Sequence, residues 1–302
     1  MAFESVPGVV DVEVVRGAQT AAGAPFDLVF EIPHGATRTE DFTRVAARMT
    51  SPVPDRLVDF FHVNTDVGAP ELAAATAQAL VAALPAHTVA IVRSRVPRTF
   101  IDCNRRLDAS PEEFKAGKVG PGLMPWVTTA EDRAMLRALY DGYVAMVRAA
   151  VTNLASRGAM VMLHTYAPRT VDVEVDLKIV ESLHRAYQPD VERTWPLRPA
   201  VDVIGNAPDG TSHAPAAVVD VLRRELAALD LELGDSATYP LHPSTLAYQH
   251  VVDHPGRALC VEFRRDLVAD PFVPFVEVRI GVAKVARLAG ALSTALQAWW
   301  SA

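Results

Sequence analysis

The chain alternates between short apolar runs rich in β-branched residues and longer stretches with helical periodicity, and this alternation limits its possible folds most. Strands are expected at residues 26–32, 88–94, 98–103, 159–165, 200–205 and 257–263. Helices are expected at residues 70–84, 129–158, 172–187, 213–229 and about 276–300. Several strands are apolar at consecutive positions, which is typical of central strands covered on both faces. The pattern predicts an α/β layered fold.

Length and composition are consistent with a single domain. The chain has 302 residues, half of them hydrophobic, so it can bury a sizeable core. No internal repeat, low-complexity tract or break in composition divides it. The Pro/Gly-rich piece at residues 108–127 is expected to be a lid or surface loop. We therefore expect one domain over residues 1–302.

Charge and hydropathy exclude some partners. A net charge of −7 argues against nucleic acid, whose phosphates require a concentrated basic surface. The N-terminus lacks the pattern of a signal peptide, and no window is long and apolar enough to span a membrane. Cys103 and Cys260 lie in apolar runs and are expected to be buried free thiols in a reducing cytoplasm. The content of Ala, Val, Arg and Pro suits a GC-rich bacterial genome.

Polar residues gather where the apolar runs end. Ligands bind at the carboxyl ends of strands in open α/β sheets, so these residues are candidates for a site. The set consists of His34, Asp66, Asp102, Asn104, Arg105, Arg106, His164, Arg169 and Glu262.

This set contains the residue types of a hydrolytic zinc site. Two imidazoles and one carboxylate hold zinc and leave a position for water, whose pKa the metal lowers to about 7. A further carboxylate must take the proton of that water, and Glu262 inside "LCVEF" is the best candidate. Arg105 is a candidate for fixing an anionic substrate or stabilising the oxyanion.

Six motifs in order resemble the N-formylglutamate amidohydrolase family. They are "IPHGAT", "NTDVGAPEL", "RTFIDCNRR", "LHTYAPR", "IGNAPDGTSHAP" and "CVEFRRD", and they extend the resemblance over residues 25–290 or so. The family is similar in fold to zinc carboxypeptidases. The resemblance therefore implies three layers (a phosphorylase/hydrolase-like fold), with a mixed, mostly parallel sheet between helices and one metal at the strand ends.

The resemblance also implies roles for individual residues. His34, Asp66 and His164 would bind one Zn²⁺ per chain, and Glu262 would act as general base and acid. The implied substrate-binding set is Asn104, Arg105 and Arg169, with Asp102 supporting Arg105 or a ligand histidine. The implied activity is hydrolysis of the linear amide of an N-acyl amino acid such as N-formylglutamate, a small anionic substrate.

The chain departs from the family pattern in two places. Met162 stands where the family often has an aspartate, so an outer hydrogen bond to the second histidine is expected to be missing. His250 stands near the position of an expected arginine, which places glutamate specificity in question. We expect His250 and Tyr248 to contact substrate, because the segment before the strand of Glu262 usually covers such a site.

Other interpretations remain open at this point. His34 and His164 are compatible with structural hydrogen bonds, Asp66 with a helix cap, and Glu71 is a competing acidic ligand. The same site would also serve a carboxypeptidase-like peptidase or another deacylase. A catalytically silent relative that binds an anionic small molecule is the alternative from a different class. The oligomeric state has no signature in the sequence.

Overall fold

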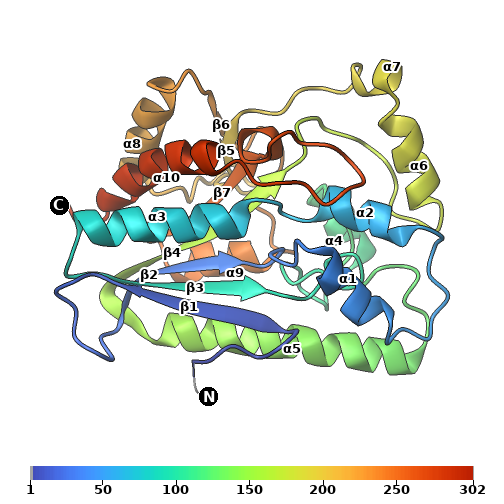
Figure 1. The fold of residues 1–302 in the computed structure, drawn as a ribbon, viewed down its shortest axis with the longest axis horizontal. Coiled ribbons are helices and arrows are strands. Elements are labelled where there is room, and N and C mark those ends of the chain that lie inside the picture. Colours follow the sequence, from blue (N-terminus) through green and yellow to red (C-terminus); the bar gives the residue numbers. More distant parts are fainter. Residues whose placement is uncertain (1–2, 302) are drawn as a thin grey trace.

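One seven-stranded sheet organises the molecule (Figure 1). The computed structural model describes residues 3–301. The strands are β1 (Val10–Arg16), β2 (Phe26–Ile32), β3 (Thr88–Ser94), β4 (Leu154–Tyr166), β5 (Val201–Val203), β6 (Leu233–Asp235) and β7 (Ala258–Arg264). Their order across the sheet is β1-β3-β2-β4-β7-β5-β6.

The sheet is mixed, with a parallel centre. Strands β3, β2, β4 and β7 run parallel, while β1 is antiparallel to β3 and β5 is antiparallel to β7. The carboxyl ends of β2, β4 and β7 therefore lie at the same edge. His164 of β4 and Glu262 of β7 are register partners there. The predicted fold class, a mixed and mostly parallel sheet between helices, is confirmed.

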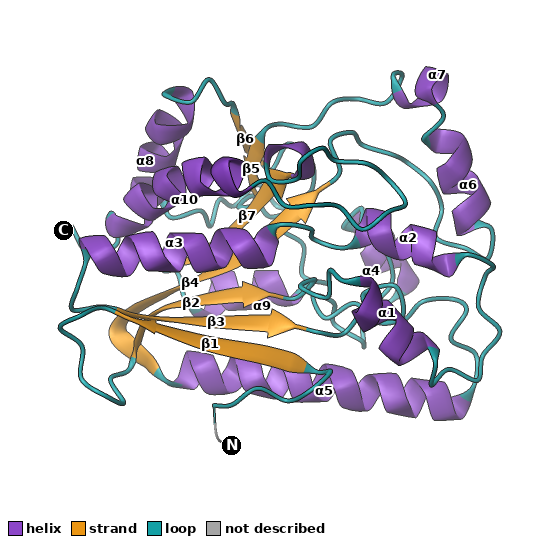
Figure 2. Cartoon of the chain, in the orientation of Figure 1, coloured by secondary structure: helices purple, strands orange, loops and turns teal. Residues whose placement is uncertain are grey.

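Helices cover both faces of this sheet (Figure 2). Helices α3 (Ala69–Ala83), α8 (Ala216–Ala227) and α10 (Val282–Gln297) pack on one face, and α5 (Ala130–Thr152) and α9 (Leu246–Asp253) on the other. The remaining helices are α1 (Thr39–Ala46), α2 (Leu57–Asn64), α4 (Pro111–Ala116), α6 (Ile179–Ala186), α7 (Pro189–Glu192) and a 3₁₀ turn (Arg265–Leu267). None of the helices within residues 3–301 is long and apolar enough to cross a membrane.

Alternating side chains divide the core into two clusters. Leu28, Phe30 and Ile32 of β2 pack against the α3 and α10 layer, while Val29 packs toward α5. Because consecutive strand residues point to opposite faces, a strand covered on both sides must be apolar throughout. Cys103 and Cys260 are buried free cysteines, as expected.

Two of the helices begin with residues that favour a helix start. The hydroxyl of Thr129 accepts a hydrogen bond from the backbone N–H of Asp132 at the start of α5. Gly68 precedes α3 with φ +86°, a left-handed conformation that suits glycine, and Pro70 occupies the first turn.

Three expected elements are wrong in type or extent. Residues 98–103 form turns instead of a strand, with only an isolated bridge between Ile101 and Leu123. The expected helix at 172–187 begins only at Ile179, because the preceding "VDVEV" alternates with period two and forms no helix. The helix expected to reach residue 158 ends at Thr152, where β4 follows. The short elements β1, β6, α1, α2 and α9 were not expected.

Candidate functional site

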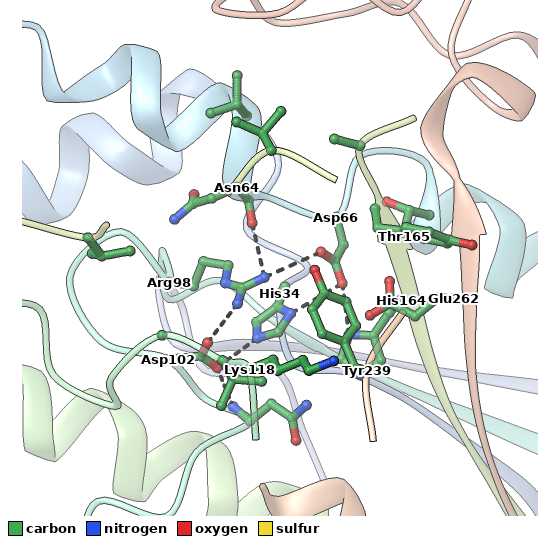
Figure 3. A pocket seen from close by; sticks show the side chains of 18 of the residues that line it. His34, Asn64, Asp66, Arg98, Asp102, Lys118, His164, Thr165, Tyr239 and Glu262 are labelled. Carbon is green, nitrogen blue, oxygen red and sulfur yellow. Dashed lines mark hydrogen bonds and ion pairs between the residues drawn. The ribbon is translucent and has the colours of Figure 1, made fainter. Parts of the chain in front are cut away.

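A cavity of about 250 Å³ opens at the carboxyl ends of β2, β4 and β7 (Figure 3). It collects most of the polar residues that the sequence placed at strand ends. The predicted site residues that line it are His34, Asp66, Asn104, Arg105, His164, Arg169 and Glu262. The predicted support residue Asp102 lines it as well.

His34, Asp66 and His164 converge inside the cavity. Oδ2 of Asp66 lies 3.2 Å from Nδ1 of His34 and 2.9 Å from Nδ1 of His164. One potential ligand atom from each residue lies within 4.8 Å of the other two. His34 follows β2, Asp66 lies between α2 and α3, and His164 belongs to β4. Glu71 is elsewhere, because its carboxylate pairs with Arg38 at 3.1 Å.

Asp66 is hydrogen-bonded to both histidines, and these contacts shift the pKa values in the cluster. Burial acts to raise the pKa of Asp66, but the two histidines reverse this effect and lower that pKa below its usual range. Burial acts to lower the pKa of His164, but the bond to Asp66 and the nearby Cys260 thiol raise it well above 6.5. Nε2 of His164 is buried without a hydrogen bond of ordinary geometry, and Met162 supplies none. Two imidazole nitrogens and a carboxylate oxygen are a donor set that fits a divalent metal.

Asp102 fixes the ring of His34 from behind. Its Oδ1 lies 2.7 Å from Nε2 of His34, and its Oδ2 lies 2.9 Å from Nη2 of Arg98 and 3.4 Å from Nη2 of Arg105. Burial acts to raise its pKa, but Arg105, His34 and Arg98 hold that pKa well below 3.8. A charged Asp102 holds a proton on Nε2 of His34, which leaves Nδ1 free to act as a ligand. The expected support of both Arg105 and a histidine is therefore present.

Glu262 has a different environment from the other two acids. Its side chain lines the cavity from β7, beside His164 and Asp202 in the strand register. Among residues 3–301 it has no hydrogen-bond or ion-pair partner, and burial raises its pKa above 4.5. A carboxylate whose pKa is raised in this way is suited to accept and return a proton.

Two predicted substrate contacts are not brought to the cavity. Tyr248 and His250 belong to helix α9, where the sequence had predicted a covering loop. Ala247 lines the cavity from this helix, whereas Tyr248 and His250 are not among the lining residues. His250 instead pairs with the buried Glu31 at 3.4 Å, and the Tyr248 ring lies 6.1 Å from that of His213. The structure therefore does not bring these two residues to the cavity, and their role in substrate binding stays a prediction.

Several cavity residues were missed by the sequence analysis. Arg98 lies in the centre of the site, where Figure 3 shows it between Asn64, Asp66 and Asp102. Its signal was the cluster of arginines in residues 93–106, which the predicted strand concealed. Lys118 comes from the loop at 108–127, and Arg265 follows β7.

Arg198 and Tyr239 form a second missed group. Nη2 of Arg198 donates a 2.8 Å hydrogen bond to the hydroxyl of Tyr239. The guanidinium also stacks on the rings of Tyr166 and Tyr239, at 5.0 and 5.3 Å from their centroids. No sequence motif predicts this group, because Arg198 and Tyr239 lie in irregular segments that are far apart in the sequence.

Comparisons with known proteins agree with this architecture. A search of curated proteins finds no match. The crystal structure of N-formylglutamate amidohydrolase from Ralstonia eutropha JMP134 matches with 17% identity and a TM-score of 0.58, covering 96% of this chain and 97% of that one. The gene product Atu2144 from Agrobacterium tumefaciens matches with 15% identity and a TM-score of 0.56, covering 99% of both chains. These similarities support the fold.

The family assignment rests on a separate comparison. The family model described as N-formylglutamate amidohydrolase matches residues 26–269, which is most of the chain and includes every residue of the converging cluster. The predicted resemblance is thereby confirmed, and the chain belongs to the N-formylglutamate amidohydrolase family.

Proposed function

We propose that this chain is a metal-dependent hydrolase that cleaves the amide of an N-formyl or related N-acyl amino acid. The observation that carries the proposal is the convergence of His34, Asp66 and His164 beside the unpartnered Glu262 in one cavity. Membership of the N-formylglutamate amidohydrolase family supports the reaction class. The proposed metal is Zn²⁺, one per chain, because nitrogen and carboxylate donors in this number suit it.

The three converging residues would hold the metal. When bound, zinc lowers the pKa of a water to about 7 and polarises the amide carbonyl. Asp102 keeps Nδ1 of His34 directed at Asp66 through its 2.7 Å contact with Nε2. This contact would hold the ring of His34 in place for metal binding.

Glu262 moves the proton in this proposal. It accepts a proton from the attacking water and then donates it to the amide nitrogen as the C–N bond breaks, which leaves the free amino acid and formate or another carboxylate. Its raised pKa favours this exchange, because a carboxylate with a raised pKa is the stronger base toward the attacking water and can still return the proton to the leaving nitrogen.

The remaining charges favour an anionic substrate. Among residues 3–301, five arginines and one lysine line the cavity, against three carboxylates. Arg98 and Asn104 line the same cavity as the converging cluster, and Nη1 of Arg98 lies 3.9 Å from Oδ1 of Asp66. We propose that Arg98 and Asn104 bind the carboxylate of the amino acid part of the substrate. Arg105 supports these two residues, and its Nη2 lies 3.4 Å from Oδ2 of Asp102.

Metal removal tests the proposal directly. Protein purified without chelator should contain about one zinc per chain and hydrolyse N-formylglutamate. A chelator should abolish turnover, and added zinc should restore it. His34→Ala should lose the metal, whereas His254→Ala, a control outside the cavity, should keep it. Stoichiometric metal without any hydrolysis of formyl, acetyl or succinyl amino acids would instead favour a silent binding protein.

A further inference from the structure

Lys118 differs from every other cation that lines the cavity. Each of the five arginines donates hydrogen bonds to oxygen atoms of the protein. The acceptors belong to Asn64 and Asp102 for Arg98, to Gly120 and Asn104 for Arg105, to Trp195 for Arg169, to Thr170 and Tyr239 for Arg198, and to Val63 and Thr165 for Arg265. Within residues 3–301, the ammonium of Lys118 has no hydrogen bond or ion pair. Lys118 is exposed at the edge of the cavity, and Figure 3 shows its side chain directed toward Tyr239.

The loop that carries Lys118 is locally well anchored. Ser110 and Glu113 form a capping box at the start of α4, and the ring of Phe114 is buried. The backbone N–H of Lys118 donates to Lys115, and that of Val119 donates to Phe114. The turn therefore presents Lys118 at a defined place at the edge of the cavity.

The backbone of Lys118 is itself unusual. Its φ is +52°, in the left-handed region that non-glycine residues seldom occupy. Gly117 is packed closely before it, since a Cβ there would lie 3.0 Å from Cγ of His242. Strained conformations of this kind persist where the surroundings impose them, and they gather at ligand-binding sites.

We propose that Lys118 binds a second anionic group of the substrate and so selects dicarboxylic N-acyl amino acids. This inference rests on the proposed function. Arg98 and Asn104, deeper in the cavity, take the first carboxylate, while the side chain of the amino acid extends toward the mouth. An ammonium without a protein partner can meet a carboxylate there, and it does not have to break an existing ion pair first.

A neutral isostere of the substrate separates charge recognition from shape. N-formylglutamate and N-formylglutamine differ only in the side-chain carboxylate and amide. Lys118→Met should lower kcat/KM for N-formylglutamate by about 10- to 100-fold, mainly through KM, because a charge-assisted hydrogen bond is lost. The value for N-formylglutamine should change by less than about twofold.

Two further variants control for the loop. Lys118→Arg should recover most of the activity on N-formylglutamate, because it retains the charge. Lys115→Met removes an exposed lysine three residues away that does not line the cavity, and it should behave as the wild type. Equal losses on both substrates, or no loss on either, would overturn the role assigned to Lys118.

A binding measurement keeps the inference separate from the proposed function. Metal-loaded wild-type protein that hydrolyses neither substrate would refute the proposed function. In that case glutarate binding, measured by calorimetry, still tests Lys118. Weaker binding of glutarate to Lys118→Met, with unchanged binding of butyrate, would support the anion site, and unchanged binding of both would overturn it.

Discussion

Two carboxylate environments lie in the same cavity and have opposite properties. On the β2 side, Asp66 and Asp102 are surrounded by histidines and arginines, and their pKa values are lowered. On the β7 side, Glu262 has no hydrogen-bonded partner within residues 3–301, and its pKa is raised. Burial acts to raise all three pKa values, so the partners decide the difference.

This contrast separates the roles that one cavity can combine. A carboxylate held charged is suited to bind a metal or to orient a histidine, as Asp66 and Asp102 do in the proposal. A carboxylate with a raised pKa is suited to exchange protons, as proposed for Glu262. Carboxyl groups with opposed environments in one cavity therefore indicate which is the acid–base group.

Among the predicted changes, Glu262→Gln should cause the largest loss of activity. The amide keeps the size of the side chain but cannot accept a proton, so kcat should fall by about 10²- to 10⁴-fold. Metal content and melting temperature should stay close to those of the wild type. Steady-state kinetics measure the fall in kcat, and elemental analysis measures the metal content. A variant that retains turnover would contradict the proposed role of Glu262.

Asp102→Asn should mainly weaken the metal site. The amide can no longer neutralise Arg98 or hold His34 by charge, so zinc affinity should fall by about 10- to 100-fold. A competition titration with a chromophoric chelator measures this change. Asp108→Asn is the matched control, because Asp108 is exposed, lies outside the cavity lining and pairs with Arg106. Unchanged zinc affinity in Asp102→Asn would show that the orientation of His34 does not depend on this charge.

The pH profile should show the smallest but most specific effect. Glu262 must be deprotonated to accept a proton, and its pKa is raised, so kcat/KM should fall with decreasing pH at a value above 4.5. Asp66 and Asp102 remain charged there, because their pKa values are lowered. The positive charge of Arg198 lowers the pKa of Glu262. Arg198→Met should therefore move this limb upward by less than about one pH unit, and a downward shift would contradict the assignment.

Local side-chain patterns were enough to predict the central strands and many of their polar ends. Strands β2 and β3 have the expected bounds, because strands buried on both faces form short runs that are mostly apolar. His34, His164 and Glu262 stood out as polar groups at or next to such runs. Arg98 was missed because Phe100 and Ile101 resemble a strand, although they are buried in turns.

The sequence by itself determined the alternation of layers and the residue types gathered at the carboxyl edge of the sheet. Only the tertiary structure decided which charged groups face one another. Lys118 and Tyr239 reach the cavity from irregular loops, while α9 directs Tyr248 and His250 away from it. The physical reason is that strand and helix periods depend on neighbouring residues, whereas the partners that set each pKa come from segments that only folding brings together.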